Sequence, residues 1–387
     1  MSIIRATQVS RAPMAALMAV GVFWGAIAAL VPDIKLVAQA SDQQLGLALL
    51  MSALGGMGAT YLVPRVGARL GRGTLPVVAL FLVAAFFLPL FARSVLALGV
   101  ALFFIGASVA MLDIAANVRI SALESRHKLH LMNANHAVFS FAFGGAALVT
   151  GLARKAGYTM DEILPALAGG CVFLVLGMME NAVTYGNANI DTQATAGRSR
   201  PPWPAIILTG VILFAAFIGE NSTEAWSALH LERTFGAAPG EGGYGPTVLG
   251  LVMGTVRLSG QVMAEKLGEA RLILWSAVLG VVGTVVIGAA LTQFGVLLGV
   301  AIVGVGMAVV VPSANSILGR LVREDQRAHA ISRAWMFGMV GFFVGPSMMG
   351  LISEVFSLRV SFFVMSVVIA LMIPATLALA GRATAGR

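Results

Sequence analysis

Charged residues are scarce in this chain. Asp, Glu, Lys and Arg make up only 11% of its 387 residues, whereas 58% are hydrophobic. A soluble globular domain carries roughly 25% charged residues, so this composition excludes a soluble fold. The mean hydropathy of +0.91 indicates a membrane protein instead. Many apolar runs have the length that crosses a bilayer as a helix, and we therefore predict an all-α polytopic membrane protein.

Cysteine and the common catalytic motifs are also scarce. Cys171 is the only cysteine, which excludes a disulfide within the chain. The sequence has no GxxxxGK(S/T) loop, no HExxH motif and no paired Cys/His spacing. We therefore expect no enzymatic activity, no metal site and no cofactor. The net charge of +8 comes without a basic cluster interleaved with aromatic residues, so we expect no nucleic-acid partner.

Hydropathy predicts twelve membrane spans separated by polar links. They cover residues 13–32, 44–64, 74–92, 95–121, 133–154, 160–183, 204–228, 244–265, 272–291, 295–321, 328–352 and 358–380. The longest polar link, 184–203, is rich in Asn, Thr, Gly and Pro, as flexible linkers are. We therefore predict an N-terminal six-helix bundle at 1–183, a linker at 184–203 and a C-terminal six-helix bundle at 204–387.

Lys and Arg residues are distributed unequally between the two sides of this arrangement. Most of them fall in the links on the side that also carries both termini and the linker. Because cytoplasmic links carry the excess of Lys and Arg, we predict that both termini and the linker lie in the cytoplasm. We expect a monomeric, multi-pass protein of the bacterial inner membrane, surrounded by the lipid bilayer.

The two halves of the sequence resemble each other at three places, in the same order. The corresponding segments are ARLGRG at 68–73 and EKLGEA at 265–270, then Ala116-Asn117 and Ala314-Asn315, then Gly144-Gly145 and Gly345-Pro346. Parallel repeats of six helices are the construction of one large class of transporters.

The first of these segments resembles the signature of the major facilitator superfamily, and the wider resemblance covers essentially the whole chain. The superfamily carries G-x-x-x-D-R-x-G-R-R between its second and third helices. Ala68 stands here in place of the aspartate. The resemblance implies a cytoplasmic gate that latches the two bundles together. The matching residues are Arg69, Gly71 and Arg72 in the first half, and Glu265, Lys266 and Gly268 in the second.

Longer stretches resemble a narrower group, the YbjJ-like permeases, which are distantly similar to sugar and fucose permeases. These stretches are WGAIAALVPDIK (24–35), QQLGLAL (43–49), DIAANVR (113–119), NANHAVFSFAFGGAA (133–147), ENSTEAWSALHL (220–231) and MVGFFVGPSMMGLIS (339–353). The resemblance to this group does not indicate a substrate.

Ionisable residues at membrane depth are functional candidates, because a charge inside a bilayer is costly. The predicted spans contain Asp113, His136, Glu180, Glu220, Glu224 and Arg257. We interpret Glu180 and Glu224 as solvated side chains near the ends of their spans. His136 is a candidate for proton coupling, with an interhelical hydrogen bond as the alternative.

Asp113 and Asn117 are four residues apart and therefore share one face of a helix. The resemblance places that face on the central cavity, where Asp113 would bind substrate or a proton; a structural ion pair is the alternative. Arg257 stays charged and needs an anion, for which Glu220, Asp113 and an anionic substrate are open candidates.

Three tryptophans and one asparagine complete the candidates. Trp24 and Trp335 could stack on a substrate ring, and Trp226 is interpreted as an interfacial residue. Asn315 is a candidate because it repeats the position of Asn117 in the second half.

The sequence as a whole favours a secondary active transporter. We expect it to move a small polar solute, sugar-like or an organic acid, by alternating access and in symport with protons. The alternatives are an exporter of amphiphilic compounds or drugs, and a non-transporting membrane sensor on the same fold.

Overall fold

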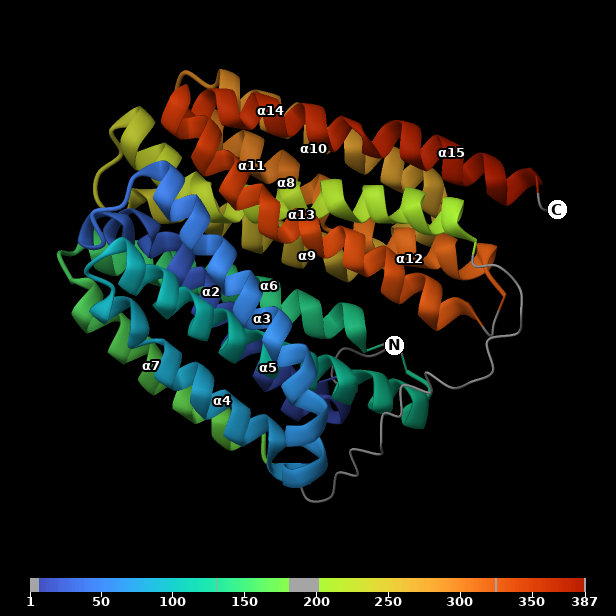
Figure 1. The fold of residues 1–387 in the computed structure, drawn as a ribbon, viewed down its shortest axis with the longest axis horizontal. Coiled ribbons are helices and arrows are strands. Elements are labelled where there is room, and N and C mark those ends of the chain that lie inside the picture. The colour runs from blue at the N-terminus through green and yellow to red at the C-terminus, as the bar shows by residue number, and fades with distance from the viewer. Residues whose placement is uncertain (1–6, 130, 181–201, 324–325, 386–387) are drawn as a thin grey trace.

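Long helices laid side by side form the described part of the chain (Figure 1). The computed structural model describes residues 7–129, 131–180, 202–323 and 326–385. The N-terminal half (7–180) contains α2 (Arg11–Val37), α3 (Asp42–Leu70), α4 (Thr74–Ala85), α5 (Val95–His127), α6 (Met132–Lys155) and α7 (Met160–Gly177). The C-terminal half (202–385) contains α8 (Trp203–Phe235), α9 (Tyr244–Leu267), α10 (Glu269–Ala289), α11 (Gln293–Met307), α12 (Val310–Leu321), α13 (Arg327–Val355), α14 (Leu358–Ala370) and α15 (Met372–Ala385). Short 3-10 turns follow α3, α4 and α8: η1 (Gly71–Gly73), η2 (Leu88–Phe91) and η3 (Glu241–Gly243).

Each of the spans predicted from hydropathy falls on one or two of these helices. Within the described residues, ten helical segments are long and apolar enough to cross a membrane. One of them, Asp42–Phe91, contains the second predicted span and all but the last residue of the third, and α9 is not among the ten. The all-α membrane class is thus confirmed, whereas the count of twelve spans stays a prediction. The predicted linker 184–203 lies almost wholly outside the described residues.

Two spans that hydropathy treats as continuous are interrupted near a proline. The tenth span is divided between α11 and α12, just before Pro312, and the twelfth between α14 and α15, just before Pro374. Proline has no N–H group to bond the carbonyl four residues earlier, and its ring crowds that carbonyl. The carbonyls concerned are those of Ala308 and Ala370, and the helices are interrupted at or just after them.

The helices pack in a pattern that repeats between the halves. In the N-terminal half α2 packs on α6 and α3 on α5; in the C-terminal half α8 packs on α13 and α9 on α11. Across the halves, α6 packs on α9 and α3 on α13. Exchanging the halves exchanges these two contacts, so the packing has the approximate two-fold symmetry of a parallel repeat. The bundle boundaries at 183 and 204 stay predictions.

Glycine allows the two halves to approach closely where α6 crosses α9. A Cβ atom built on Gly250 would lie 2.6 Å from the backbone nitrogen of Gly144. Helices at this distance leave no room for a side chain between their backbones, which is how small residues serve helix packing in membranes.

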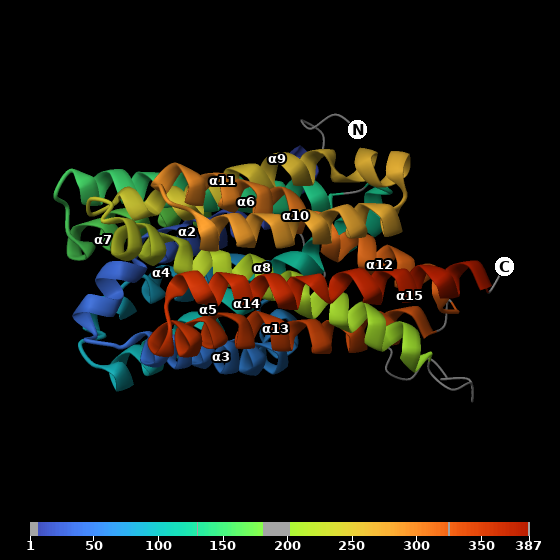
Figure 2. The same cartoon turned by 90° about the horizontal axis from the view of Figure 1, so that it is seen from above.

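The start of α2 and the end of α15 lie at the same end of the bundle (Figures 1 and 2). We call this the terminal end, and the other the opposite end. The arrangement agrees with an even number of crossings. The assignment of the terminal end to the cytoplasm stays a prediction.

Candidate functional site

An ion pair between α8 and α9 lies at membrane depth. The Nη2 atom of Arg257 donates to Oε1 of Glu220 at 2.9 Å, and the two side chains are each 17% exposed. The Nη1 atom of Arg257 donates to Oγ of Ser140 on α6 at 2.6 Å. Of the two carboxylates that the sequence left open for Arg257, the structure thus pairs it with Glu220. Ser140 carries the contact into the N-terminal half.

Further hydrogen bonds extend this ion pair through the N-terminal half. The hydroxyl of Ser140 donates to the backbone oxygen of His136 at 3.0 Å. The Nε2 atom of His136 lies 3.1 Å from Oδ1 of Asn117 on α5. Nδ2 of Asn117 donates in turn to the backbone oxygen of Asp113 at 2.9 Å. Asp113 itself forms no ion pair with a described residue.

Ser140 is the member of this set that sequence analysis missed. The available signal was its spacing, because Ser140 follows His136 by four residues and therefore shares its helix face. A serine in a helix is only a weak indication of a functional site, because its hydroxyl commonly donates to the carbonyl one turn earlier. Here the same hydroxyl also accepts from Arg257.

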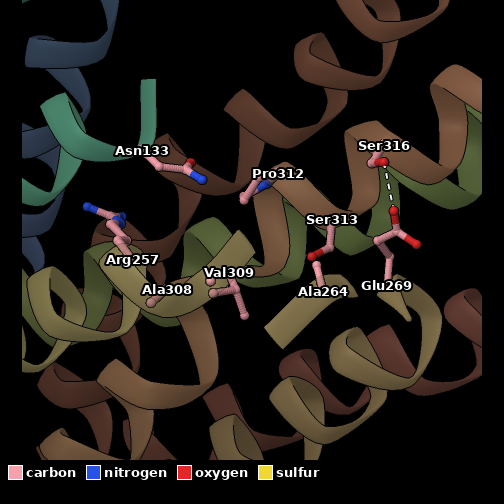
Figure 3. A pocket seen from close by; sticks show the side chains of 10 residues that line it. Asn133, Arg257, Ala264, Glu269, Ala308, Val309, Pro312, Ser313 and Ser316 are labelled. Carbon is pink, nitrogen blue, oxygen red and sulfur yellow. Dashed lines mark hydrogen bonds between the residues drawn. The ribbon is translucent and has the colours of Figure 1, made fainter. Parts of the chain in front are cut away.

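A cavity of about 270 Å³ lies on the terminal side of Arg257, between α9 and α12 (Figure 3). Arg257 and Asn133 lie at one end of it, and Glu269 and Ser316 at the other. The lining residues are Asn133, Arg257, Gly260, Ala264, Glu269, Ala308, Val309, Pro312, Ser313 and Ser316, and none of these is aromatic. The cavity is therefore small, partly polar and charged at both ends.

The carboxylate of Glu269, at the end of the cavity away from Arg257, has both oxygens paired within the C-terminal half. Oε1 of Glu269 accepts from Ser316 at 2.9 Å and from Nη1 of Arg320 at 2.6 Å. Oε2 accepts from Nη2 of Arg320 at 2.7 Å. The two parallel bonds to one guanidinium form the bidentate geometry of a strong ion pair.

At the opposite end of the bundle, Arg154 in the last turn of α6 binds carboxylates of both halves. Its Nε and Nη2 atoms each lie 2.6 Å from an oxygen of Asp33 on α2. Its Nη1 atom lies 2.5 Å from Oε1 of Glu232 on α8. Only 4% of the Arg154 side chain is exposed, so this is a buried ionic link between the halves.

A second ionic link at the opposite end is centred on Asp42, whose side chain is 3% exposed. Its carboxylate binds Lys35 at 2.7 Å within the N-terminal half and Arg233 at 2.6 Å across the halves. The hydroxyl of Ser353 on α13 donates to it as well. Oε2 of Glu354 accepts from the backbone N–H of Asp42 at 2.9 Å. The start of α3 is thus held to α8 and α13.

A third link, between Lys155 and Glu241, is more exposed. The Nζ atom of Lys155 lies 2.8 Å from Oε1 of Glu241, and the lysine side chain is 50% exposed. The hydrogen bond from Lys155 holds the pKa of Glu241 below its ordinary value. The Arg154, Asp42 and Lys155 links therefore join the halves at one end of the molecule.

Toward the terminal end, three contacts between described residues, Arg119–Glu180, Glu269–Arg320 and Arg333–Trp203, each join two elements of the same half. Arg119 on α5 binds Glu180 through three N···O contacts of 3.0 to 3.2 Å. Arg333 on α13 lies over the ring of Trp203 on α8 at 5.0 Å. The pairing of Glu180, whose side chain is 16% exposed, corrects its interpretation as a solvated side chain.

The residues expected at the cytoplasmic gate lie at the terminal end, in the turns after α3 and α9. Arg69, Arg72 and Lys266 are exposed. Gly71 and Gly268 have φ of 49° and 77°, a conformation that favours glycine, so the two turns correspond in backbone as well as in sequence. The side chain of Glu265 lies outside the described part of the chain. A gating role for these residues stays a prediction.

The remaining candidates lie away from the cavity lining. Trp24 packs on Phe23 with ring centroids 5.8 Å apart, and Trp335 on Phe217 at 5.5 Å. The Oδ1 atom of Asn315 is buried without a hydrogen-bond partner among the described residues. Trp226 was interpreted as interfacial, and this is wrong: its side chain is fully buried. Its Nε1 atom donates to the backbone oxygen of Pro346 at 3.1 Å.

Comparison with known proteins identifies relatives over nearly the whole chain. Residues 209–386 match the family model of the Major Facilitator Superfamily. The chain is 24% identical to an uncharacterized MFS-type transporter of Yersinia pestis over 347 residues, which cover 88% of each protein. Its fold is similar to that of a D-xylose-proton symporter, with TM-score 0.78, 15% identity and coverage of 98% and 97% of the two chains. It is also similar to the nucleoside transporter NupG, with TM-score 0.73, 13% identity and coverage of 96% and 99%.

Proposed function

We propose that this chain, which belongs to the major facilitator superfamily, is a secondary active transporter that moves a small polar solute by alternating access. One observation carries the proposal. The ionic links between the halves gather at the opposite end, whereas the cavity beside Arg257 lies toward the terminal end. This is the arrangement of a transporter closed on one side of a central site. Transport would require the links to break while the halves close over the cavity from the other side.

Proton coupling is supported by the charges at membrane depth. Glu220 is paired with Arg257. Glu224, one turn further along α8, is partly buried and not the solvated side chain that the sequence suggested, and neither Glu224 nor Asp113 on α5 forms an ion pair with a described residue. An unpaired carboxylate is costly at membrane depth, and a bound proton removes its charge. Carboxylates at this depth, these two or Glu220 itself, can therefore couple the conformational change to a proton gradient by gaining and losing a proton. The structurally similar D-xylose-proton symporter shows that this fold can couple a solute to protons.

The cavity lining favours a polar solute over an amphiphilic drug. It contains Arg257, Asn133 and two serines, and no aromatic side chain is among its residues. Ligand pockets in general are lined mainly by hydrophobic and aromatic groups, and a few placed polar groups set their specificity. We place the protein in the bacterial inner membrane as a monomer, with the terminal end in the cytoplasm, because Lys and Arg predominate in the links on that side. Membership of the YbjJ-like permeases is part of the same proposal.

The proposal can be tested by measuring distances at both ends of the molecule in one preparation. In a Cys171→Ala background, one spin-label pair at Ser125→Cys and Arg271→Cys spans the halves at the terminal end. A second pair at Tyr158→Cys and Ala238→Cys spans them at the opposite end. Double electron–electron resonance in lipid nanodiscs, at acidic and at alkaline pH, gives the distance distribution of each pair.

Alternating access with proton coupling requires the two pairs to change in opposite directions with pH. The terminal pair should shorten under the conditions in which the opposite pair lengthens. A single unchanging distance at both ends, as a non-transporting sensor scaffold could give, would overturn the proposal. So would a change of both pairs in the same direction, because the site would then be open to both sides at once.

A further inference from the structure

From the charges around the cavity we infer that the solute is a small, non-aromatic carboxylate, which Arg257 binds while Glu220 takes up one proton. The inference rests on the proposed transport function and names the chemical class of the solute. It concerns the one place where a charged side chain with uncommitted hydrogen-bond donors lines the cavity.

Arg257 has N–H groups that are not engaged in hydrogen bonds with described residues. A guanidinium presents five N–H groups in a rigid planar fork, and two of them are bonded here, to Ser140 and to Glu220. The fork matches the two oxygens of a carboxylate, which is why arginine is favoured wherever this group is recognised. A carboxylate entering the cavity would thus find charge-assisted donors at its Arg257 end.

The other charged residue of the lining offers no comparable site to a cation. Both oxygens of Glu269 are engaged by Arg320 and Ser316. A cationic solute would have to displace a bidentate guanidinium partner, which is energetically unfavourable. The cavity therefore complements an anion at one end and is already neutralised at the other.

The volume of the cavity and its lining residues narrow the class of solute further. A volume of about 270 Å³ lies just below the usual range for pockets that hold small ligands. Asn133, Ser313 and Ser316 can bond hydroxyl groups, whereas none of the ten lining residues offers a ring for stacking. A hydroxy acid or a sugar acid fits this chemistry, and a nucleobase or an aromatic acid does not.

The charge of the site explains why one proton is taken up with the solute. With Glu220 ionised, the Arg257–Glu220 pair is neutral, and an added carboxylate would leave one uncompensated negative charge at membrane depth. If Glu220 accepts a proton as the carboxylate binds, the net charge of the site does not change. One monovalent carboxylate and one proton would then cross together, and transport would be electroneutral.

One other ionisable group on α8, Glu224, bears on this balance. Glu224 lies one turn away on the same helix, and His136 is joined to Arg257 only through Ser140. The charged residues on the other elements packed against α8 lie toward the ends of those elements. Glu224 is the one neighbour that could accept the proton in place of Glu220, and a Glu224→Gln variant separates the two.

The first experiment compares two solutes of nearly the same shape. Glucuronate and glucose differ at one carbon, which carries a carboxylate in the first and a hydroxymethyl group in the second. Isothermal titration calorimetry on the purified wild-type protein should show binding of glucuronate, and of the smaller hydroxy acid lactate, at least tenfold tighter than binding of glucose. Glucose binding as tightly as glucuronate would overturn the inference, and this measurement needs no variant.

The second experiment follows the proton. Proteoliposomes containing a pH-sensitive dye should acidify inside when glucuronate or lactate is added outside, at a rate that does not depend on a potassium–valinomycin potential. Glu220→Gln should still exchange labelled carboxylate but move no proton, and Arg257→Lys should lose carboxylate binding. Arg119→Lys and Glu180→Gln are matched controls, because that pair is also partly buried but lies within one half, away from the cavity.

Failure of the inference and failure of the proposed function give different results. If a neutral sugar is carried and carboxylates are not, the solute class is wrong while transport stands. Potential-driven uptake of the carboxylate would refute the one-proton balance. If the two ends of the molecule never move in opposite directions, the proposed function itself fails, whatever the cavity binds.

Discussion

The Nη1 atom of Arg154 lies 2.5 Å from Oε1 of Glu232, and this ion pair joins the last turns of α6 and α8 across the two halves. The same guanidinium binds Asp33 with its other nitrogen atoms. Each of these carboxylates depends on Arg154 for its countercharge among the described residues. The side chain is therefore the main electrostatic tie that holds the opposite end closed.

We predict that Arg154→Gln opens the opposite end. Removing one partner from a buried ion pair costs about 3–5 kcal/mol, and only the closed state would bear this cost. The state open at the opposite end should become the major one. The label pair at Tyr158→Cys and Ala238→Cys should then report a longer distance in the folded variant.

Lys155→Gln serves as the control for this prediction. Its ion pair with Glu241 also crosses the halves, but the lysine side chain is 50% exposed. Exposed pairs contribute little to stability because water screens them, so this variant should keep the wild-type distance distribution. Equal distances in Arg154→Gln and wild type would show that the buried pair does not hold the closed state.

The second prediction concerns two neighbouring glycines of α6. A Cβ atom on Gly144 would lie 2.9 Å from backbone atoms of Thr247 and Leu251 on α9, whereas a Cβ atom on Gly145 would meet nothing within 4 Å. Gly144→Ala should therefore force α6 and α9 apart and cost roughly 1–3 kcal/mol of stability. Gly145→Ala should be neutral or gain up to about 1 kcal/mol, because alanine favours the helix.

Thermal unfolding of the purified variants in detergent compares these two substitutions directly. The melting temperature of Gly144→Ala should fall, and that of Gly145→Ala should stay at or above the wild-type value. Equal melting temperatures would mean that the contact between α6 and α9 is looser than the structure describes.

Sequence analysis located the helices well because the bilayer fixes their length and composition. A hydropathy profile has no term for a missing N–H group, so the interruptions before Pro312 and Pro374 were not predicted, although both prolines can be read from the sequence. The sequence left the partner of Arg257 open between Glu220, Asp113 and an anionic substrate. The choice depends on how α8 and α9 are rotated about their axes, and one sequence does not contain that information.

The ionic links at the opposite end were missed for a related reason. Asp33, Arg154 and Glu232 lie at the ends of three spans that are far apart in sequence, where a solvated side chain is the ordinary expectation. The fold brings them together and excludes water from Arg154. Trp226 was misjudged in the same way, because its place near a span end suggested the membrane interface. Packing of α8 on α13 buries it instead.

The third prediction tests the charge partner of Arg257. Arg257→Ala leaves Glu220 without its countercharge and should cost about 3 kcal/mol, the lower end of the range for buried pairs, since both side chains are 17% exposed. Adding Glu220→Gln should restore most of the lost stability, because no unpaired charge then remains. Adding Asp113→Asn should restore none of it. Melting temperatures of the single and double variants decide the matter, and rescue by Asp113→Asn alone would contradict the observed pairing.

The last prediction concerns Asp113→Asn, which tests Asp113 against Glu220 as the residue that carries the coupled proton. Asp113 forms no ion pair with a described residue, and the backbone oxygen that accepts from Asn117 is kept by the substitution. Folding and membrane insertion should therefore change little. If Asp113 carries a proton, the variant should lose uphill accumulation of the solute but retain exchange across the membrane. If it binds the solute, both activities should fall. Proteoliposomes loaded with labelled glucuronate or lactate can measure exchange and proton-driven uptake side by side. Wild-type rates of both in a well-folded variant would remove Asp113 from the transport site and leave the pair of Arg257 and Glu220 as its charged centre.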